Sequence, residues 1–421
     1  MKKRPFENKI IIIGADHRNT LSAIRAFGQK NCDIVLVIHG HVLARKKVRV
    51  FNSKYVKQDQ AYVIENEPVD LLNVLWKYAD PELKCVVFPA SDFAGFVIDS
   101  NYTSLEKSFI IPGFRGAPGK VCSMMDKWNQ YLFACQHNIP MAETFILDTG
   151  EPVIPEDLPF PCIIKPRVSA WGAKSDISVC SNVDDLNDAI EKYRQNHYSD
   201  ALVQAFLPKK AEANTLGFVL EENNQYHTVG GVALKIRDQL ESATSFAVFI
   251  ADLSSLDQEP DEKLNAVFSD KQITKNEYSL LLDNVRKINS ILEEEQYCGH
   301  FDMDLLICND KVYLNEINYR YSGNGYAINN RLINAPFYWA NSLILGEESS
   351  VSVKAVDIGS YFMSELNDIM YLKRRDLSIA QWLHDIKLTK AFAVFDKRDY
   401  RGSLRFFNAF LHGYLKRILK H

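Results

Sequence analysis

The stretch that decides the fold is DLLICNDKVYLNEINYR, which runs from Asp304 to Arg320. Its apolar residues and its central turn predict two antiparallel strands, 302–308 and 311–317. Such a hairpin can bring side chains of both strands together on one face. Asp304 and Glu316 stand among apolar neighbours, and two carboxylates held side by side repel each other unless a cation lies between them. The hairpin therefore predicts a metal site.

The residues after Glu316 extend this polar face. Asn318 and Arg320 follow at i+2 and i+4, so an extended chain points them the same way. Magnesium prefers oxygen ligands and is usually shared with substrate phosphates, and a guanidinium can hold a phosphoryl or carboxylate group. We therefore predict Asp304, Glu316 and Asn318 as metal ligands and Arg320 as a catalytic residue. The alternative is a solvated hairpin edge with scattered charges.

Two lysines form a cationic counterpart earlier in the chain. Lys127 stands at the start of a predicted helix, 126–137, where the helix dipole favours anions. Lys165 ends an apolar predicted strand, 161–165, where a lysine is unusual. A loop of small residues follows at 169–175; it could cradle phosphates through its backbone N–H groups, and a plain hairpin turn is the alternative. The loop residues that we assign to phosphate binding are Ser169, Gly172 and Lys174.

The first part of the chain alternates apolar strands with helices. Strands are predicted at 9–14, 33–38 and 84–89, and helices at 20–29 and 70–78, which is the pattern of an open parallel α/β sheet. In such a sheet, ligands bind at the carboxyl ends of the strands. The turns that follow the first and third strands carry polar residues, but neither has a complete phosphate-binding motif, and helix capping is the competing explanation.

Changes in composition divide the chain into three parts. A Gly- and Pro-rich run at 112–119 separates an N-terminal α/β domain, 1–119, from a mixed α+β domain, 120–345. The remainder, 346–421, is an extension that ends in a basic amphipathic helix. We expect this helix to dock on the protein's own core, with membrane apposition or a dimer contact as the alternatives.

The overall composition excludes several classes of protein. The formal net charge is −4, so nothing draws the whole chain toward nucleic acid. None of the eight cysteines forms a C-x-x-C pair, which favours reduced thiols over disulfides or zinc. No apolar stretch approaches the roughly 20 residues of a membrane span. We expect a soluble, cytoplasmic protein.

Taken in order, these segments resemble the ATP-grasp superfamily between about residue 10 and residue 340. The likeness rests on Met125-Asp126-Lys127, on Pro161 to Pro166, on the strand 202–208, and on the E-x-N-x-R run that begins at Glu316. Asp304, twelve residues before Glu316, matches the spacing of the two magnesium carboxylates. The resemblance implies an adenine and ribose site and two phosphate lysines, formed by Gln204, Phe206, Leu207, Glu212, Lys127 and Lys165.

Within the superfamily, the chain resembles the carbamoyl-phosphate-synthase-like carboxylate–amine ligases, of the D-aspartate-ligase kind. Lys235 and Arg237 match a cationic strand that faces the transferred phosphoryl or the acceptor carboxylate, which implies a catalytic role for both. The chain departs from the family pattern at three points: the phosphate loop has the single glycine Gly172 beside Trp171, Tyr319 replaces a usual proline, and Asp304 is the shorter acid.

The resemblance implies a ligase that uses ATP and Mg²⁺, with Mn²⁺ as a substitute metal. It would form an amide through an acyl phosphate, on an amino acid or a substrate linked to the cell envelope or to a sugar. Its partners would be a small carboxylate, a small amine and a second copy of the chain. Two alternatives remain open: a nucleotide-binding regulatory protein that ligates nothing, and a scaffold recruited to a membrane by its basic C-terminal helix.

Overall fold

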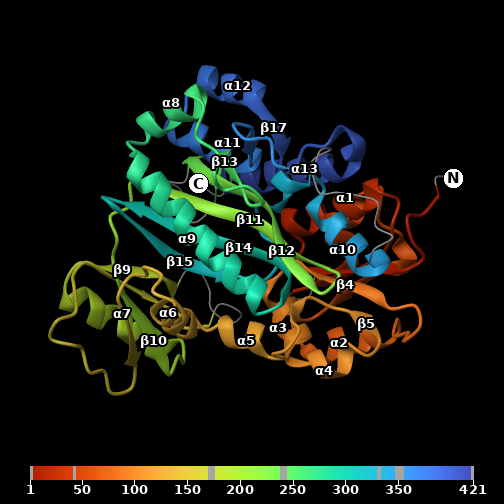
Figure 1. Cartoon of the computed structure of the whole chain (residues 1–421), viewed down its shortest axis with the longest axis horizontal. Coiled ribbons are helices and arrows are strands. Elements are labelled where there is room, and N and C mark those ends of the chain that lie inside the picture. Colours follow the sequence, from red (N-terminus) through yellow and green to blue (C-terminus); the bar gives the residue numbers. More distant parts are fainter. Residues whose placement is uncertain are drawn as a thin grey trace.

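Three β-sheets follow one another along the chain in a computed structural model (Figure 1). The structure describes residues 3–40, 44–168, 176–237, 244–329, 333–346 and 355–418, with the backbone alone for 413–418. The N-terminal sheet lies at the right of Figure 1, a small lobe projects at the lower left, and a large sheet occupies the centre.

The N-terminal sheet is parallel, with strand order β3-β2-β1-β4-β5. Helices cover its faces, so its central strands are apolar throughout; the four isoleucines of β1 are fully buried. This confirms the α/β class predicted for this part of the chain. Its elements are β1 (Lys9–Gly14), α1 (Arg18–Gln29), β2 (Asp33–His39), β3 (Ala61–Ile64), α2 (Pro68–Trp76), β4 (Cys85–Pro89), α3 (Asp92–Ser100), α4 (Tyr102–Leu105) and β5 (Phe109–Ile110).

The small lobe is an antiparallel sheet of order β7-β10-β8-β9 with its own apolar core. Lys165 ends one of its central strands, so the backbone fixes where this side chain leaves the sheet. The elements of the lobe are β7 (Thr144–Asp148), β8 (Cys162–Lys165), β9 (Ser178–Cys180), α7 (Val183–Gln195) and β10 (Asp200–Ala205).

The large sheet has the order β15-β14-β11-β12-β13-β16-β17, with β6 pairing to β14. A long helix, α9, crosses one face and buries its apolar stripe there (Figure 1). The strands are β6 (Gly113–Phe114), β11 (Ala211–Glu222), β12 (Gln225–Arg237), β13 (Phe246–Asp252), β14 (Tyr297–Cys308), β15 (Lys311–Asn318), β16 (Tyr361–Met363) and β17 (Thr389–Phe392). The predicted hairpin corresponds to β14–β15.

The N-terminal sheet and the large sheet share one core through a helix between them. The ring centroid of Phe88 in β4 lies 6.3 Å from that of Phe218 in β11 and 5.9 Å from that of Trp339 in α10. All three side chains are buried. The remaining helices are α5 (Lys120–Met124), α6 (Lys127–Gln136), α8 (Glu262–Asp270), α9 (Lys275–Glu294), α10 (Ala335–Leu345), α11 (Glu365–Arg374), α12 (Ile379–Leu388) and α13 (Tyr400–Ile418). Short 3₁₀ turns are η1 (Arg45–Lys47), η2 (Val50–Asn52), η3 (Gln58–Gln60), η5 (Gly325–Ile328) and η7 (Lys397–Asp399).

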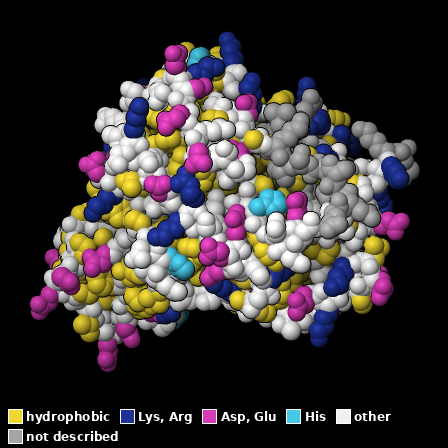
Figure 2. Space-filling view, viewed as in Figure 1, with side chains coloured by type: hydrophobic (Ala, Val, Ile, Leu, Met, Phe, Trp, Pro, Cys, Tyr) yellow, Lys and Arg dark blue, Asp and Glu magenta, His cyan; other side chains and the backbone are white. Residues whose placement is uncertain are grey.

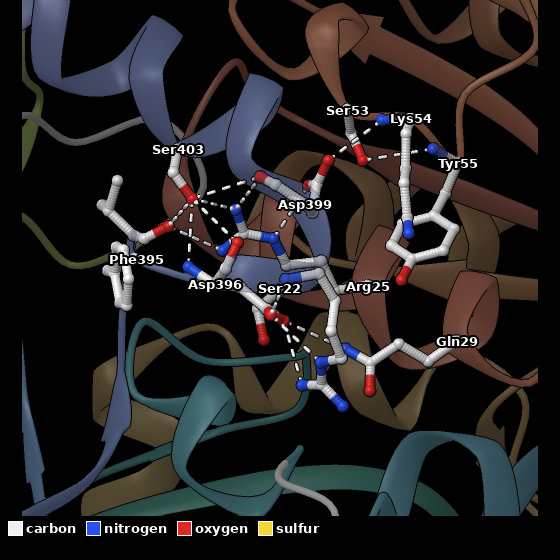
Figure 3. Close-up of polar contacts among 12 residues, drawn as sticks. Ser22, Arg25, Gln29, Ser53, Lys54, Tyr55, Phe395, Asp396, Asp399 and Ser403 are labelled. Atoms are coloured by element: carbon white, nitrogen blue, oxygen red, sulfur yellow. Dashed lines mark hydrogen bonds and ion pairs between the residues drawn. The ribbon is translucent and has the colours of Figure 1, made fainter.

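A buried ion pair joins the C-terminal extension to the N-terminal sheet. Nε of Arg25, in α1, lies 2.9 Å from a carboxylate oxygen of Asp399, and the two residues are 4% and 0% exposed. The same guanidinium donates to the hydroxyl of Ser403 at 3.0 Å and to the carbonyl of Val394 at 2.8 Å (Figure 3). All three guanidinium nitrogens of Arg25 therefore donate a hydrogen bond, as burial of the charge requires.

The basic C-terminal helix begins by packing on the protein itself. Ser403 and Phe406 of α13 are 3% exposed each, so the start of this helix is anchored as the docking interpretation expects. None of the helices in the described ranges combines the length and the apolar character that a bilayer span needs. Acidic and basic side chains are interspersed on the face drawn in Figure 2.

We expect Asp399→Asn to lower the free energy of unfolding by about 3 kcal/mol or more, because it leaves the buried Arg25 charge without its partner. The measurement is urea unfolding followed by circular dichroism. Asp270→Asn, an exposed position at the end of α8, serves as the matched control and should stay within about 0.5 kcal/mol of the parent chain. Equal midpoints for the two variants would contradict this account of the docking.

Candidate active site

A β-bulge decides which side chains of the closing hairpin lie on one face. Near the turn, Leu305 of β14 faces Leu314 of β15. The next residue of β14 away from the turn, Asp304, faces Glu316, so β15 carries an extra residue, Asn315. Without that residue, Asp304 would face Asn315, and Glu316 would point to the opposite side of the sheet. The bulge therefore brings the two predicted carboxylates together.

The bulge follows from the burial pattern of β15. Leu314 and Ile317 are both buried, at 1% and 2% exposure, although they stand three residues apart. A regular strand sends positions three apart to opposite faces. An extra residue between them lets both pack into the core beneath α9, while the polar residues after the bulge keep the other face.

Further polar groups on this face come from neighbouring strands. Asp302 pairs with Asn318 across the hairpin, and Asn214 of β11 pairs with Asp304. The amide of Asn214 donates to a carboxylate oxygen of Asp302 at 3.2 Å. Since alternate residues share a face, Asp302, Asp304 and Asn214 form one polar patch on an otherwise apolar sheet.

The patch is short of positive charge. Burial, and then the charge of Asp304, raises the pKa of Asp302 to about 7. Burial also raises the pKa of Asp304, although the Lys235 ammonium, 3.0 Å from its carboxylate oxygen, acts in the opposite direction. The side-chain oxygen of Asn214 is buried and accepts no hydrogen bond from the described residues. These features fit a bound cation, which would lower the pKa of both acids.

The donor set fits magnesium in a particular way. Within the described ranges, no group of three or more His, Cys, Asp or Glu side chains is placed to hold a metal ion by itself. Asp304, Glu316 and Asn318 offer two carboxylates and one amide oxygen, so water or a phosphate must complete the shell. This is the usual arrangement for magnesium that is shared with a nucleotide.

The opposite wall of the site is cationic. The Lys127 ammonium lies 3.7 Å from a carboxylate oxygen of Glu316, at the start of α6. Lys165 is 8% exposed and donates to the side-chain oxygen of Gln204 at 2.8 Å. Burial lowers the pKa of Lys165 to about 8; the charge of Glu316 opposes this shift, and the charge of Lys127 adds to it.

The two walls enclose a cavity of about 610 Å³. Three parts of the fold contribute to it: the small lobe, the large sheet, and the strand ends of the N-terminal sheet. Of the predicted residues, it is lined by Lys127, Lys165, Lys235, Asp304, Glu316, Asn318 and Arg320. The turns after β1 and β4, left undecided by the sequence, also reach it through His17, Arg18, Asn19 and Asp92.

Arg237, for which a catalytic role was predicted, is not among the residues that line this cavity. Its guanidinium lies 2.6 Å from a carboxylate oxygen of Asp368 and 2.5 Å from one of Asp385, in α11 and α12. It also stacks over the ring of Phe246. Because β12 continues past the cavity, the end of this strand ties the large sheet to the C-terminal helices.

The residues predicted to bind the nucleotide differ in whether their side chains are exposed or already engaged in other contacts. The Gln204 side chain is enclosed between Lys165 and Thr144, so only its backbone is left for a base. Phe206 is 39% exposed beside it, at the end of β10. Glu212 forms ion pairs with Lys209 and Lys235, which occupy its carboxylate. The phosphate loop residues Ser169, Gly172 and Lys174 lie outside the described residues.

Sequence reasoning missed several residues of the site. Asp302 stands two positions before Asp304 and was detectable by simple alternation. Asp92, 3.0 Å from Nε of Arg320, positions that guanidinium, but its turn looked like a helix cap. Asn214 gave no signal, because its partner Asp304 lies 90 residues away in the chain.

Comparisons with known proteins identify the fold. No protein-family model matches the chain, and no curated protein matches it. A solved carboxyaminoimidazole ribonucleotide synthase from Aspergillus clavatus, complexed with ATP, superposes with a TM-score of 0.59 at 13% identity, over 84% of this chain and 80% of that one.

Two further solved structures give the same result. The biotin carboxylase domain of the Hydrogenobacter thermophilus 2-oxoglutarate carboxylase, a dimer in complex with MgADP, has a TM-score of 0.57 at 14% identity, over 84% of this chain and 73% of that one. An L-amino acid ligase from Bacillus licheniformis has a TM-score of 0.54 at 12% identity, over 84% and 79%. At such identities the likeness shows the fold alone: this chain has the ATP-grasp fold.

Proposed function

We propose that the chain is an ATP-dependent carboxylate–amine ligase that forms an amide through an acyl phosphate. The observation that carries the proposal is the pairing of Asp304 with Glu316 opposite two cationic side chains, Lys127 and Lys165, in one cavity. Carboxylates on one wall and ammonium groups on the other suit a metal-bound polyphosphate. Solved proteins of this fold hold ATP or MgADP, which supports the choice of nucleotide.

In this proposal, the two walls share the charge of the nucleotide. Lys127 and Lys165 neutralise phosphate oxygens, and Asp304, Glu316 and Asn318 hold magnesium or, as a substitute, manganese. When bound, the metal supplies positive charge at the phosphates and fixes their orientation. The exposed ring of Phe206 and the backbone around Gln204 and Leu207 contact the base. Glu212 remains our prediction for the ribose, and to bind it the carboxylate must exchange its ion pair with Lys209 or Lys235 for the ribose hydroxyls.

The first chemical step is phosphoryl transfer. A carboxylate oxygen of the substrate forms a bond to the γ-phosphorus, the bond from that phosphorus to the bridging oxygen breaks, and ADP leaves with the electron pair. Arg320, held by Asp92, and Lys235 stabilise the charge on the moving group. Positioning and electrostatic stabilisation account for catalysis, without a covalent bond to the protein.

The second step forms the amide. The amine nitrogen attacks the acyl carbon, the C–O bond to phosphate breaks, and phosphate departs with the bonding electrons while the amine gives up a proton to it. Water would destroy the acyl phosphate, so the reaction needs an enclosed site. The segment 169–175 remains our prediction for the closing loop.

We propose an amino acid, or a carboxylate linked to the cell envelope or to a sugar, as the substrate. The end of the cavity away from Lys165 is polar and hydrogen-bonding, with Arg18, Asn324 and Asn367 among its lining residues. Such a wall suits a small polar acid better than an apolar one. An L-amino acid ligase among the solved structures of this fold points the same way.

The remaining expectations stand as part of the proposal. Residues 120–345 form the catalytic unit, 1–119 contribute the substrate end of the cavity, and 346–421 brace them. The eight cysteines are free thiols, which favours the reducing cytoplasm. A dimer among the solved structures of this fold supports a homodimer.

The test is ADP release from MgATP with amino acids, peptides and sugar acids supplied in pairs. We expect one pair to release ADP and phosphate in equal amounts, and Glu316→Gln to slow that release by about 100-fold or more, because it removes a charged ligand of the magnesium that stabilises the phosphates. Glu262→Gln, an exposed position in α8, is the matched control. Full turnover by Glu316→Gln would show the metal assignment to be wrong. Nucleotide binding without ADP release from any pair would favour a regulatory protein.

The pKa of Lys165 gives a pH dependence. Burial lowers this pKa to about 8, so its ammonium is present below pH 8 and is lost as the pH rises through that value. We therefore expect the Kd for MgADP to increase between pH 7 and 9.5, by up to about tenfold per pH unit above 8. Lys165→Arg keeps its charge throughout and should flatten the curve. The measurement is titration calorimetry of both proteins; parallel curves would contradict the assignment of Lys165 to phosphate.

A further inference from the structure

A second cavity, of about 620 Å³, lies between α1 and the C-terminal extension. We call it the junction cavity. It is bounded by one face of α1, by residues 326–329, and by the segment 390–398 that follows from β17 into η7. None of its lining residues also lines the cavity that contains Asp304 and Glu316. Its size is that of a site for a small molecule.

The inner wall of the junction cavity is rigid and polar. Arg25 is fixed there by Asp399 and Ser403, as Figure 3 shows. Asn329, 7% exposed, donates its amide to the backbone carbonyl of Ser22 at 2.5 Å. Each of these contacts joins α1 to a different segment, so the wall does not have to be ordered by a ligand.

Two buried oxygens of this wall have no partner among the described residues. They are the hydroxyl of Tyr326, 6% exposed, and the side-chain oxygen of Asn329. A buried polar atom that makes no hydrogen bond costs about 1–3 kcal/mol. The wall therefore contains two buried polar atoms whose hydrogen bonds the described residues do not supply.

The rim of the junction cavity carries an excess of positive charge. Lys390 and Lys397 are exposed, and neither forms an ion pair with another described residue. Arg398 is paired with Asp396 at 3.0 Å, and Asp357 is the other acid of the lining. The lining therefore holds two lysines that are available to an anion.

An aromatic surface stands beside these lysines. The ring of Phe395 is 54% exposed, and its centroid lies 6.2 Å from that of Phe392 in an edge-to-face arrangement. Both residues line the junction cavity. An exposed phenylalanine that lines the same cavity as two lysines offers stacking and charge to one bound molecule.

We propose that the junction cavity binds a small anion that carries a planar ring, with its phosphate or carboxylate at Lys390 and Lys397 and its ring against Phe395. This site is separate from the proposed ligase site, and it does not depend on the ligase activity.

The test is titration calorimetry of the full chain with phenyl phosphate and with benzoate, and with inorganic phosphate and phenol as the separate halves of the first probe. All titrations are made with MgADP at saturation. We expect at least one ring-bearing anion to bind at a single site, about tenfold or more tighter than phosphate or phenol. The tighter of the two identifies the anionic group.

Charge reversal distinguishes this site from unspecific attraction. The double variant Lys390→Glu/Lys397→Glu should weaken binding of the ring-bearing anion about tenfold or more. The control Lys107→Glu/Lys263→Glu makes the same change in net charge at exposed positions outside both cavities and should bind normally. Phe395→Ala should weaken phenyl phosphate but not inorganic phosphate, since the ring contact alone is lost.

Three results would overturn the proposal. They are no binding of either ring-bearing anion at millimolar concentration, equal weakening by the two double variants, and loss of binding in Lys165→Ala with no change in the junction variant. The last result would place the bound anion in the cavity of Asp304 and Glu316. Unfolding midpoints in urea show whether each variant is folded before it is titrated.

Discussion

The bulge at Asn315 is the constraint on which the site depends. The core beneath α9 requires Leu314 and Ile317 on the same side of β15, and an extra residue between them is how a strand with that spacing meets the requirement. Glu316 then has to point away from the core, opposite Asp304. Packing of apolar side chains on one face of β15 thus directs the Glu316 carboxylate to the other face. The cost to the fold is a local loss of strand-to-strand hydrogen bonds at the bulge.

Two lysines neutralise part of the negative charge on the same face before any ligand binds. Lys235 lies 3.0 Å from Asp304, and Lys127 lies 3.7 Å from Glu316. These pairs hold the carboxylates near the positions that a metal would need, which limits the reorganisation on binding. The same pairs also oppose metal binding, because each ammonium must lose part of its interaction with its carboxylate partner. Burial raises the pKa of Asp302 to about 7. Among these groups, Asp302 is therefore the one whose pKa an added cation lowers most.

The sequence predicted what local pattern controls, and it failed where distant segments meet. The hairpin and the lysine at the end of β8 each follow from apolar spacing within a single segment. The polar face across β11 and β14 does not, because Asn214 gains its place through a strand pairing that no local pattern reveals. Arg237 shows the converse: its position in a cationic strand suggested catalysis, but its partners Asp368 and Asp385 lie more than 130 residues further along the chain.

Helix α1 connects these features. Arg18 at its first turn lines the cavity of the proposed ligase site and donates to Ser364 at 2.5 Å, and Arg25 lines the junction cavity and binds Asp399. Seven residues separate the two arginines, which is about two turns or roughly 10 Å of helix, so they lie on the same side. The C-terminal extension therefore grips α1 at both positions. The same helix thus carries one residue of each cavity, and both residues have partners in the C-terminal extension.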